Sequence, residues 1–254
     1  IAVNSNNIVS NIGFGLRNDA TAMVNASGNW WGTYAAATIP TYLSGSVDYT
    51  PWLHYGTDMS PDPGFQPDLS YLHVDDTSPQ TGTTGRIQEG INMVTGSTVE
   101  VEEGTYAEQV VIKKSLTLRG EGNTSIIRPT SIPRLFPRYD LTTLNTASII
   151  VADSVTTGGV MVKRLRVDAS GITSMPPGAN SFMGIQYRET DGLIDSVTVD
   201  GFLNTLSPSL GFYLSAVWNP TTIEIARSAF SAYTKNGITC NGSYVTANVH
   251  HNTV

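Results

Sequence analysis

Two aspartates and two nearby arginines are the residues whose types and spacing could most readily support acid–base chemistry. Asp168 and Asp200 each follow a short apolar segment, and Arg164 and Arg166 lie just before the first of them. Two carboxyl groups on adjacent strands can act together in catalysis, because one donates a proton as a carboxylic acid while the other acts as a nucleophile in its carboxylate form. Aspartate also commonly ends a strand. We therefore interpret Asp168 and Asp200 as strand-ending residues and predict no catalytic residues.

Metal-binding side chains are present but lack the spacing of compact metal sites. Asp191, Asp195 and Asp200 are separated by four and five residues, which matches no calcium loop. The four histidines show no zinc-type spacing, and two of them, His250 and His251, fit a strand and the turn after it. We expect no cofactor. A structural Ca²⁺ is best placed, if it binds at all, among aspartates that could equally be solvated, namely Asp58, Asp62, Asp68, Asp75 and Asp76.

Cysteine and tryptophan have structural and functional interpretations. Cys240 is the single cysteine, so no internal disulfide can form, and we interpret it as a small buried thiol. Exposed tryptophans stack on sugar rings, whereas buried ones fill a core. For Trp30 and Trp31 we predict packing against residues 49–52. Three N-x-[ST] sequons permit glycosylation, at Asn25, Asn123 and Asn241.

The composition excludes several classes of protein. Charged residues make up only 14% and the net charge is −7, so a basic surface for nucleic acid or anionic membranes is absent. No apolar stretch approaches the roughly 18 to 20 residues that span a bilayer, and no signal peptide is visible. Abundant Gly, Asn, Ser and Thr favour an extracellular or cell-surface protein built of stacked sheets.

The elements that would position these residues fall into three segments. Residues 1–55 contain short apolar strands separated by Asn/Gly turns. Residues 56–80 carry four prolines and five aspartates, which predicts a linker or an extended surface crossing without a central strand. Residues 81–254 begin with a short helix over 86–94, for which Thr84 is the expected N-cap, and continue as short strands.

A repeat of a small polar residue, any residue and an apolar residue connects the strand segments. It occurs at Asp200–Phe202, Ser228–Phe230 and Asn252–Val254, with an apolar residue three positions earlier in each case (Val197, Ile225 and Val249). The start of the chain shows it at Asn6–Ile8, after Val3, and again 23 residues later at Asn29–Trp31. A period of 20 to 30 residues with strands predicts a solenoid in which equivalent strands stack. A β-sandwich is the alternative, but it does not explain the repeated Asn.

Residues 84–122 resemble a known family. Their sequence, TGRIQEGINMVTGSTVEVEEGTYAEQVVIKKSLTLRGEG, is similar to the opening of right-handed parallel β-helix proteins of the pectin-lyase-like superfamily, including pectin methylesterases. The resemblance implies an all-β, right-handed β-helix with a capping helix. It implies no activity, because the aspartate pair, glutamines and arginine of the methylesterases have no matching motif here. Residues 19–55, with NASGNWWGTY and GSVDYTPWL, resemble the closing coils of bacterial and archaeal β-helix surface proteins.

We therefore expect residues 1–55 to be closing coils, 56–80 a linker, and 81–254 the cap and coils of a second β-helical block. The expected function is structural or adhesive. Head-to-tail stacking of copies or tandem repeats would form a filament, surface layer or array, because unguarded strand edges pair with other chains. The residues expected at this junction are Val3, Asn6, Ile8, Val249, Asn252 and Val254. The alternative is a protein that binds or degrades polysaccharides, which fold analogy alone supports.

Overall fold

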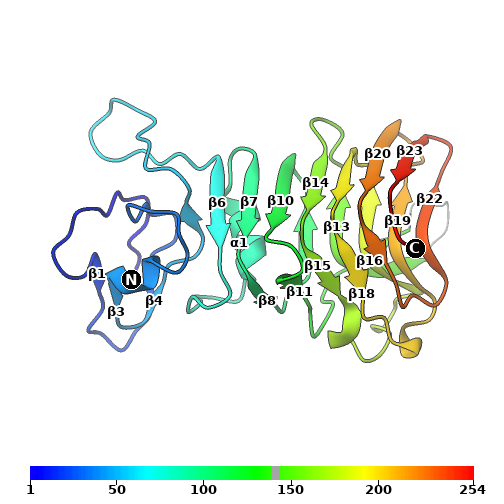
Figure 1. The fold of residues 1–254 in the computed structure, drawn as a ribbon, viewed down its shortest axis with the longest axis horizontal. Coiled ribbons are helices and arrows are strands. Elements are labelled where there is room, and N and C mark those ends of the chain that lie inside the picture. The colour runs from blue at the N-terminus through cyan, green and yellow to red at the C-terminus, as the bar shows by residue number, and fades with distance from the viewer. Residues whose placement is uncertain (139–143) are drawn as a thin grey trace. The chain divides into compact units, whose positions relative to one another are not determined.

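The computed structural model describes residues 1–138 and 144–254 and shows an all-β protein with mainly parallel sheets (Figure 1). The chain divides into two compact units, residues 1–104 and residues 105–254. The predicted predominance of parallel strands is confirmed. One pair in the second unit is antiparallel, where β12 runs against β13.

Three sheets make up the second unit, and each grows by one strand at a time along the chain. The first contains β10 (Leu116–Gly120), β14 (Val160–Lys163), β17 (Gly192–Asp195), β20 (Thr221–Ala226) and β23 (Val245–His250). The second contains β8 (Gly104–Tyr106), at the unit boundary, then β11 (Ser125–Ile127), β15 (Arg166–Asp168), β18 (Thr198–Asp200) and β21 (Ala229–Phe230). The third contains β9 (Val110–Ile112), β12 (Leu135–Pro137), β13 (Asn145–Asp153), β16 (Ser181–Arg188), β19 (Ser209–Ser215) and β22 (Asn236–Asn241). Short 3-10 turns follow β15 (Ala169–Gly171) and β18 (Asn204–Leu206).

Consecutive strands supply one member to each sheet, and we call such a set a rung. Strands β13, β14 and β15 form one rung, β16 to β18 the next, and β19 to β21 the one after. The last described rung contains β22, β23 and a parallel bridge from Thr253 to Ala229. Register places apolar side chains in columns, so that Leu118, Val162, Ile194 and Ile225 lie one above another, all fully buried. Such columns hold the unit together, because each residue buries its apolar surface against its neighbours.

The first unit has shorter strands and its own core. Its parallel pairs are β1 (Leu16–Arg17) with β3 (Leu43–Ser44) and β2 (Val24–Asn25) with β4 (Val47–Asp48), joined by the 3-10 turn Ile39–Tyr42. Parallel bridges from Ala2 to Asn25 and from Asn7 to Trp30 add an earlier rung. The core contains Ala26, Trp31, Ile39, Val47, Tyr49 and Trp52. The predicted packing of Trp31 against residues 49–52 is thus confirmed.

The structure corrects the interpretation of residues 56–80 as a linker without a central strand. Strand β6 (Tyr71–Val74) pairs with β5 (Trp52–Leu53) on one side and with β7 (Thr98–Val101) on the other. Pro67 and Pro79 flank this strand, and the 11 residues between them contain no proline. They are therefore free to donate every backbone N–H, which a paired strand requires.

The predicted helix is present as α1 (Arg86–Met93). Its N-cap is Gly85 and no side chain caps it, so the prediction of Thr84 as N-cap was wrong. Ile87 and Ile91 are buried, and the helix packs on β6 and β7.

Candidate functional site

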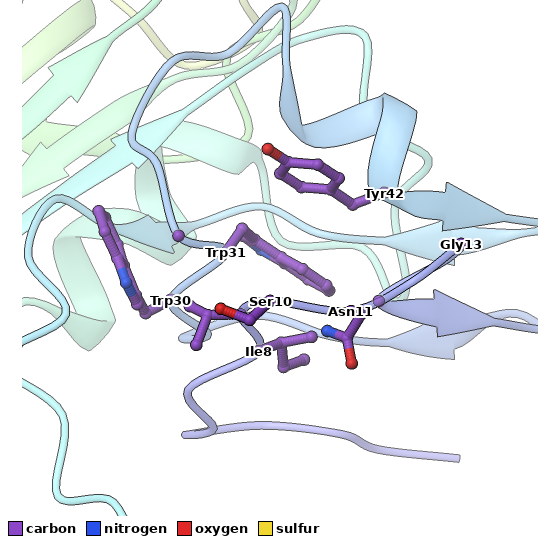
Figure 2. A pocket seen from close by; sticks show the side chains of 10 residues that line it. Ile8, Ser10, Asn11, Gly13, Trp30, Trp31 and Tyr42 are labelled. Carbon is purple, nitrogen blue, oxygen red and sulfur yellow. The ribbon is translucent and has the colours of Figure 1, made fainter.

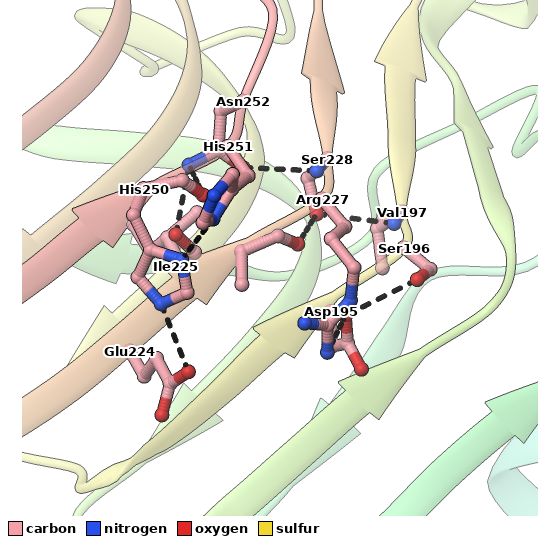
Figure 3. A network of polar contacts seen from close by, with 11 residues as sticks. Asp195, Ser196, Val197, Glu224, Ile225, Arg227, Ser228, His250, His251 and Asn252 are labelled. Atoms are coloured by element: carbon pink, nitrogen blue, oxygen red, sulfur yellow. Dashed lines mark hydrogen bonds and ion pairs between the residues drawn. The ribbon is translucent and has the colours of Figure 1, made fainter.

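In the second unit, a polar turn between two strands recurs at the same place in successive rungs, and we call this turn the corner (Figure 3). Ser196, Arg227 and His251 have φ values of 57°, 50° and 56°, and each precedes the residue that occupies the corner. The corner residues are Val197, Ser228 and Asn252. Asn252 Oδ1 accepts from the backbone N–H of Ser228 at 2.9 Å, and Asn252 Nδ2 donates to the carbonyl of Ile225 at 2.8 Å. One side chain therefore connects two rungs.

The first unit contains the same corner. Ser5 and Gly28 have positive φ and precede Asn6 and Asn29. Asn29 Oδ1 accepts from the backbone N–H of Asn6 at 2.8 Å, and Asn29 Nδ2 donates to the carbonyl of Val3 at 2.5 Å. The predicted stacking of Asn6 on Asn29 and of Ser228 on Asn252 is confirmed.

The third member of the predicted repeat was wrong. Asp200 does not stack on Ser228. It pairs with Asp168, while Val197 holds the corner. Val197 and Ser228 are 31 residues apart rather than the 28 inferred from Asp200. Ile194, and not Val197, is the register partner of Ile225. A fixed spacing failed because the rungs contain turns of different length.

The last described rung leaves its core-facing positions uncovered. Val249 is the register partner of the fully buried Ile225, yet it is 45% exposed. Val254 follows the Thr253 bridge as Phe230 follows Ala229, and it is 61% exposed whereas Phe230 is 2% exposed. Cys240 pairs with the buried Leu214 and is exposed. The prediction of a buried thiol was therefore wrong for this structure, because no rung among the described residues covers this position.

The earliest rung of the first unit has a similar apolar edge. Ile12 and Phe14 are exposed, and Val3 and Ile8 are half-buried. Residues 1–16 and residues 236–254 contain no Asp, Glu, Lys, Arg or Pro. Neither edge therefore carries the residues that usually prevent pairing between strands of different molecules.

A pocket of about 400 Å³ lies beside this earliest rung (Figure 2). Trp30, Trp31 and Tyr42 supply its aromatic lining, with Ser10 and Asn11 as polar side chains. Trp31 is almost fully buried, and its Nε1 has no hydrogen-bond partner among the residues that the structure describes. None of the lining side chains is charged, so the pocket is suited to a neutral ligand.

The first unit also contains a cluster of histidine and glutamate that spacing alone did not reveal. Nδ1 of His54 lies 2.6 Å from Nε2 of His73, and Nδ1 of His73 lies 2.6 Å from Oε1 of Glu102. Burial raises the pKa of Glu102 to about 7, and the negative charge of Asp75 adds to this. Tyr34 and Tyr71 stack on His54. Strand pairing within residues 52–102 was the missing signal, because it places these side chains on adjacent strands.

The structure brings Asp168 and Asp200 together, but as partners of one arginine. Arg166 Nε lies 3.0 Å from Asp200 Oδ1, and its NH2 atom lies 3.6 Å from Asp168 Oδ2. Asp168 also accepts a hydrogen bond from the backbone N–H of Ser170. The hydrogen bond to Asp200, together with the charges of both carboxylates, raises the pKa of Arg166.

The three sequons lie in different environments. The Asn25 amide donates to Thr81 Oγ1 and accepts from Ser27. Asn123 is exposed and accepts from Thr198, and Asn241 donates to Tyr213 OH. Within residues 1–138 and 144–254, no three His, Cys, Asp or Glu side chains are grouped so that they could hold a metal ion.

Comparisons with family models, curated proteins and solved structures found no match to this chain. In the part of the chain that the structure describes, no helix is long and apolar enough to cross a bilayer.

Proposed function

We propose that this protein is a structural, non-enzymatic module that associates with further copies of itself through its earliest and last rungs. Its rungs would be coils of a right-handed parallel β-helix of the pectin-lyase-like type. The product would be an extracellular filament, surface layer or adhesive array. Low charge and neutral polar turns support this location, since stacked Asn, Ser and Thr suit such surfaces.

The exposure of Val249 carries the proposal. Each residue below it in its column is fully buried, so a further rung would bury Val249 in the same way. Fully burying a valine is worth roughly 1.5–3 kcal/mol. Val254 would be buried with it, and the backbone edge of β23 would find hydrogen-bond partners.

Sedimentation velocity over a hundredfold concentration range tests the proposal. We expect association of the native chain and a marked loss of it in Val249→Lys, since a buried lysine at the junction is costly. Leu203→Lys is the matched control, because Leu203 is 40% exposed and belongs to the rung of β16 to β18, not to the earliest or the last rung. A monodisperse monomer throughout, or equal effects of both substitutions, would contradict self-association.

A second candidate function follows from the aromatic pocket beside the earliest rung. Aromatic side chains with hydroxyl and amide groups, and no charge, favour a neutral sugar ring. Titration with neutral mono- and disaccharides should then quench tryptophan fluorescence in the native chain. Trp30→Ala should abolish the response, whereas Trp218→Ala, at an exposed tryptophan of the second unit, should not.

A further inference from the structure

The corner hydrogen bonds define a rule for adding a rung, and the inference drawn from it rests on the proposed self-association. In both units, the Asn of the later rung accepts from the backbone N–H of the earlier corner residue. Its Nδ2 donates to the carbonyl three residues before that corner residue. Because Asn29 and Asn252 obey this rule in separate units, it describes the corner itself.

The backbone next to each corner follows the same rule. Trp30 N donates to the carbonyl of Asn6 at 2.9 Å, and Ile8 N donates to that of Trp30 at 2.8 Å. In the second unit, Thr253 N donates to the carbonyl of Ser228 at 2.9 Å, and Phe230 N donates to that of Thr253 at 2.9 Å. In both units, therefore, a rung and the rung that follows it are hydrogen-bonded in the same register.

The earliest and the last rung have complementary hydrogen-bonding groups. The backbone N–H groups of Asn252 and Val254 make no hydrogen bond to the described residues, and neither does that of Asn7. Asn6 Nδ2 donates to the carbonyl of Asn4 in its own rung, just as Asn252 Nδ2 donates to that of His250. Asn252 Nδ2 also donates to the carbonyl of Ile225 in the rung before it.

We infer that a second copy of this chain docks head-to-tail, with its Asn6 in the position that follows Asn252. Asn6 Oδ1 of the second copy accepts from Asn252 N, and Asn6 Nδ2 donates to the carbonyl of Val249. Asn7 N donates to the carbonyl of Asn252, and Val254 N donates to that of Asn7. The contact is heterologous, so it propagates unless it closes into a ring.

The apolar side chains continue through the same register. Two residues beyond each corner residue lie Phe230 and Val254 in the second unit, and Ile8 and Trp31 in the first. Docking places Ile8 of the second copy on Val254, which gives one uninterrupted apolar column. Residues 1–16 and 236–254 contain no Asp, Glu, Lys or Arg. No side chain of these four types from the two rungs therefore has to be desolvated when the rungs meet.

Disulfide trapping tests the register. Paired strands lie about 4.8 Å apart, within the range of Cα separations that a disulfide spans. In a Cys240→Ser background, we expect Asn7→Cys mixed with Thr253→Cys to form a cross-linked dimer under mild oxidation. Both residues are exposed in the isolated chain. Asn11→Cys, four residues further along the earliest rung, is the mismatched control and should cross-link at a rate at least about tenfold lower.

The outcomes separate the register from the proposed function. Association without the Asn7–Thr253 cross-link, or with equal trapping by Asn11→Cys, overturns the register and leaves self-association standing. Cross-linking of either variant with itself overturns the head-to-tail arrangement. A chain that neither associates nor cross-links overturns both proposals.

Asn6→Ala gives a second measurement, since losing two polar contacts should weaken association about tenfold or more. Asn4→Ala, in the same rung, should leave association unchanged.

Discussion

Nδ1 of His73 lies 2.6 Å from Oε1 of Glu102, and both side chains are largely buried. Burial is the main reason that the pKa of Glu102 rises to about 7. The bond survives ionisation, because a protonated Glu102 donates to His73 and an ionised one accepts from it. Through His73, the charge state of Glu102 is coupled to His54.

Glu102 should make the stability of the first unit depend on pH. Its pKa is raised on folding, so its contribution is fully present below about pH 4.5 and is lost as pH rises through about 7. We expect urea denaturation to show that Glu102→Gln reduces this loss between pH 5 and pH 8, by on the order of 2 kcal/mol. Glu103→Gln, at the adjacent glutamate, is the matched control. Identical pH profiles for the native chain and Glu102→Gln would refute the role of Glu102.

Gly90 of α1 should tolerate no side chain. A Cβ there would lie 2.8 Å from Cγ1 of Val74 and 3.1 Å from Cγ1 of Val99. Although alanine favours helices, we expect Gly90→Ala to destabilise the protein by about 1–3 kcal/mol through overpacking. Asn92→Ala, at an exposed position of the same helix, should be neutral or slightly stabilising. Thermal unfolding of both variants decides between these effects.

The two aspartates around Arg166 should affect stability and not turnover. Asp200 is partly exposed, so Asp200→Asn should cost less than about 1 kcal/mol. Asp168 is 3% exposed and also accepts from Ser170 N, so Asp168→Ala should cost about 1–3 kcal/mol. We expect no cleavage of uronate polymers by the native chain. Measurable turnover that disappears in Asp168→Asn or Asp200→Asn would show that the pair is catalytic.

The sequence predicted the class of fold well, because its signals are local. Alternating apolar residues identify strands, and repeated Asn at Asn6, Asn29 and Asn252 identifies the corner. The helix over 86–94 also followed from apolar spacing alone. Register between rungs was less predictable, since turns differ in length and nothing local distinguishes Val197 from Ile194 as the corner residue.

Sites that depend on strand pairing could not be predicted from the sequence. His54, His73 and Glu102 are far apart in the chain, and β6 carries one of them within a segment rich in Pro and Asp. Pairing of β5, β6 and β7 brings them together. The burial of Cys240 was predicted wrongly for a related reason, because it depends on what covers the rung and not on the rung itself.

Most corners of this protein hold left-handed backbone at a residue other than glycine, with Gly28 as an exception. Ser5, Arg164, Ser196, Arg227 and His251 all adopt φ values near 50° to 60°. A left-handed residue other than glycine costs roughly 1–2 kcal/mol, and the rungs tolerate this at one corner after another. The side chains at these positions vary in size and charge while the main chain keeps one path. The corners thus form a row of positions at which side chains can be substituted, in evolution or by engineering, while the path of the main chain stays the same.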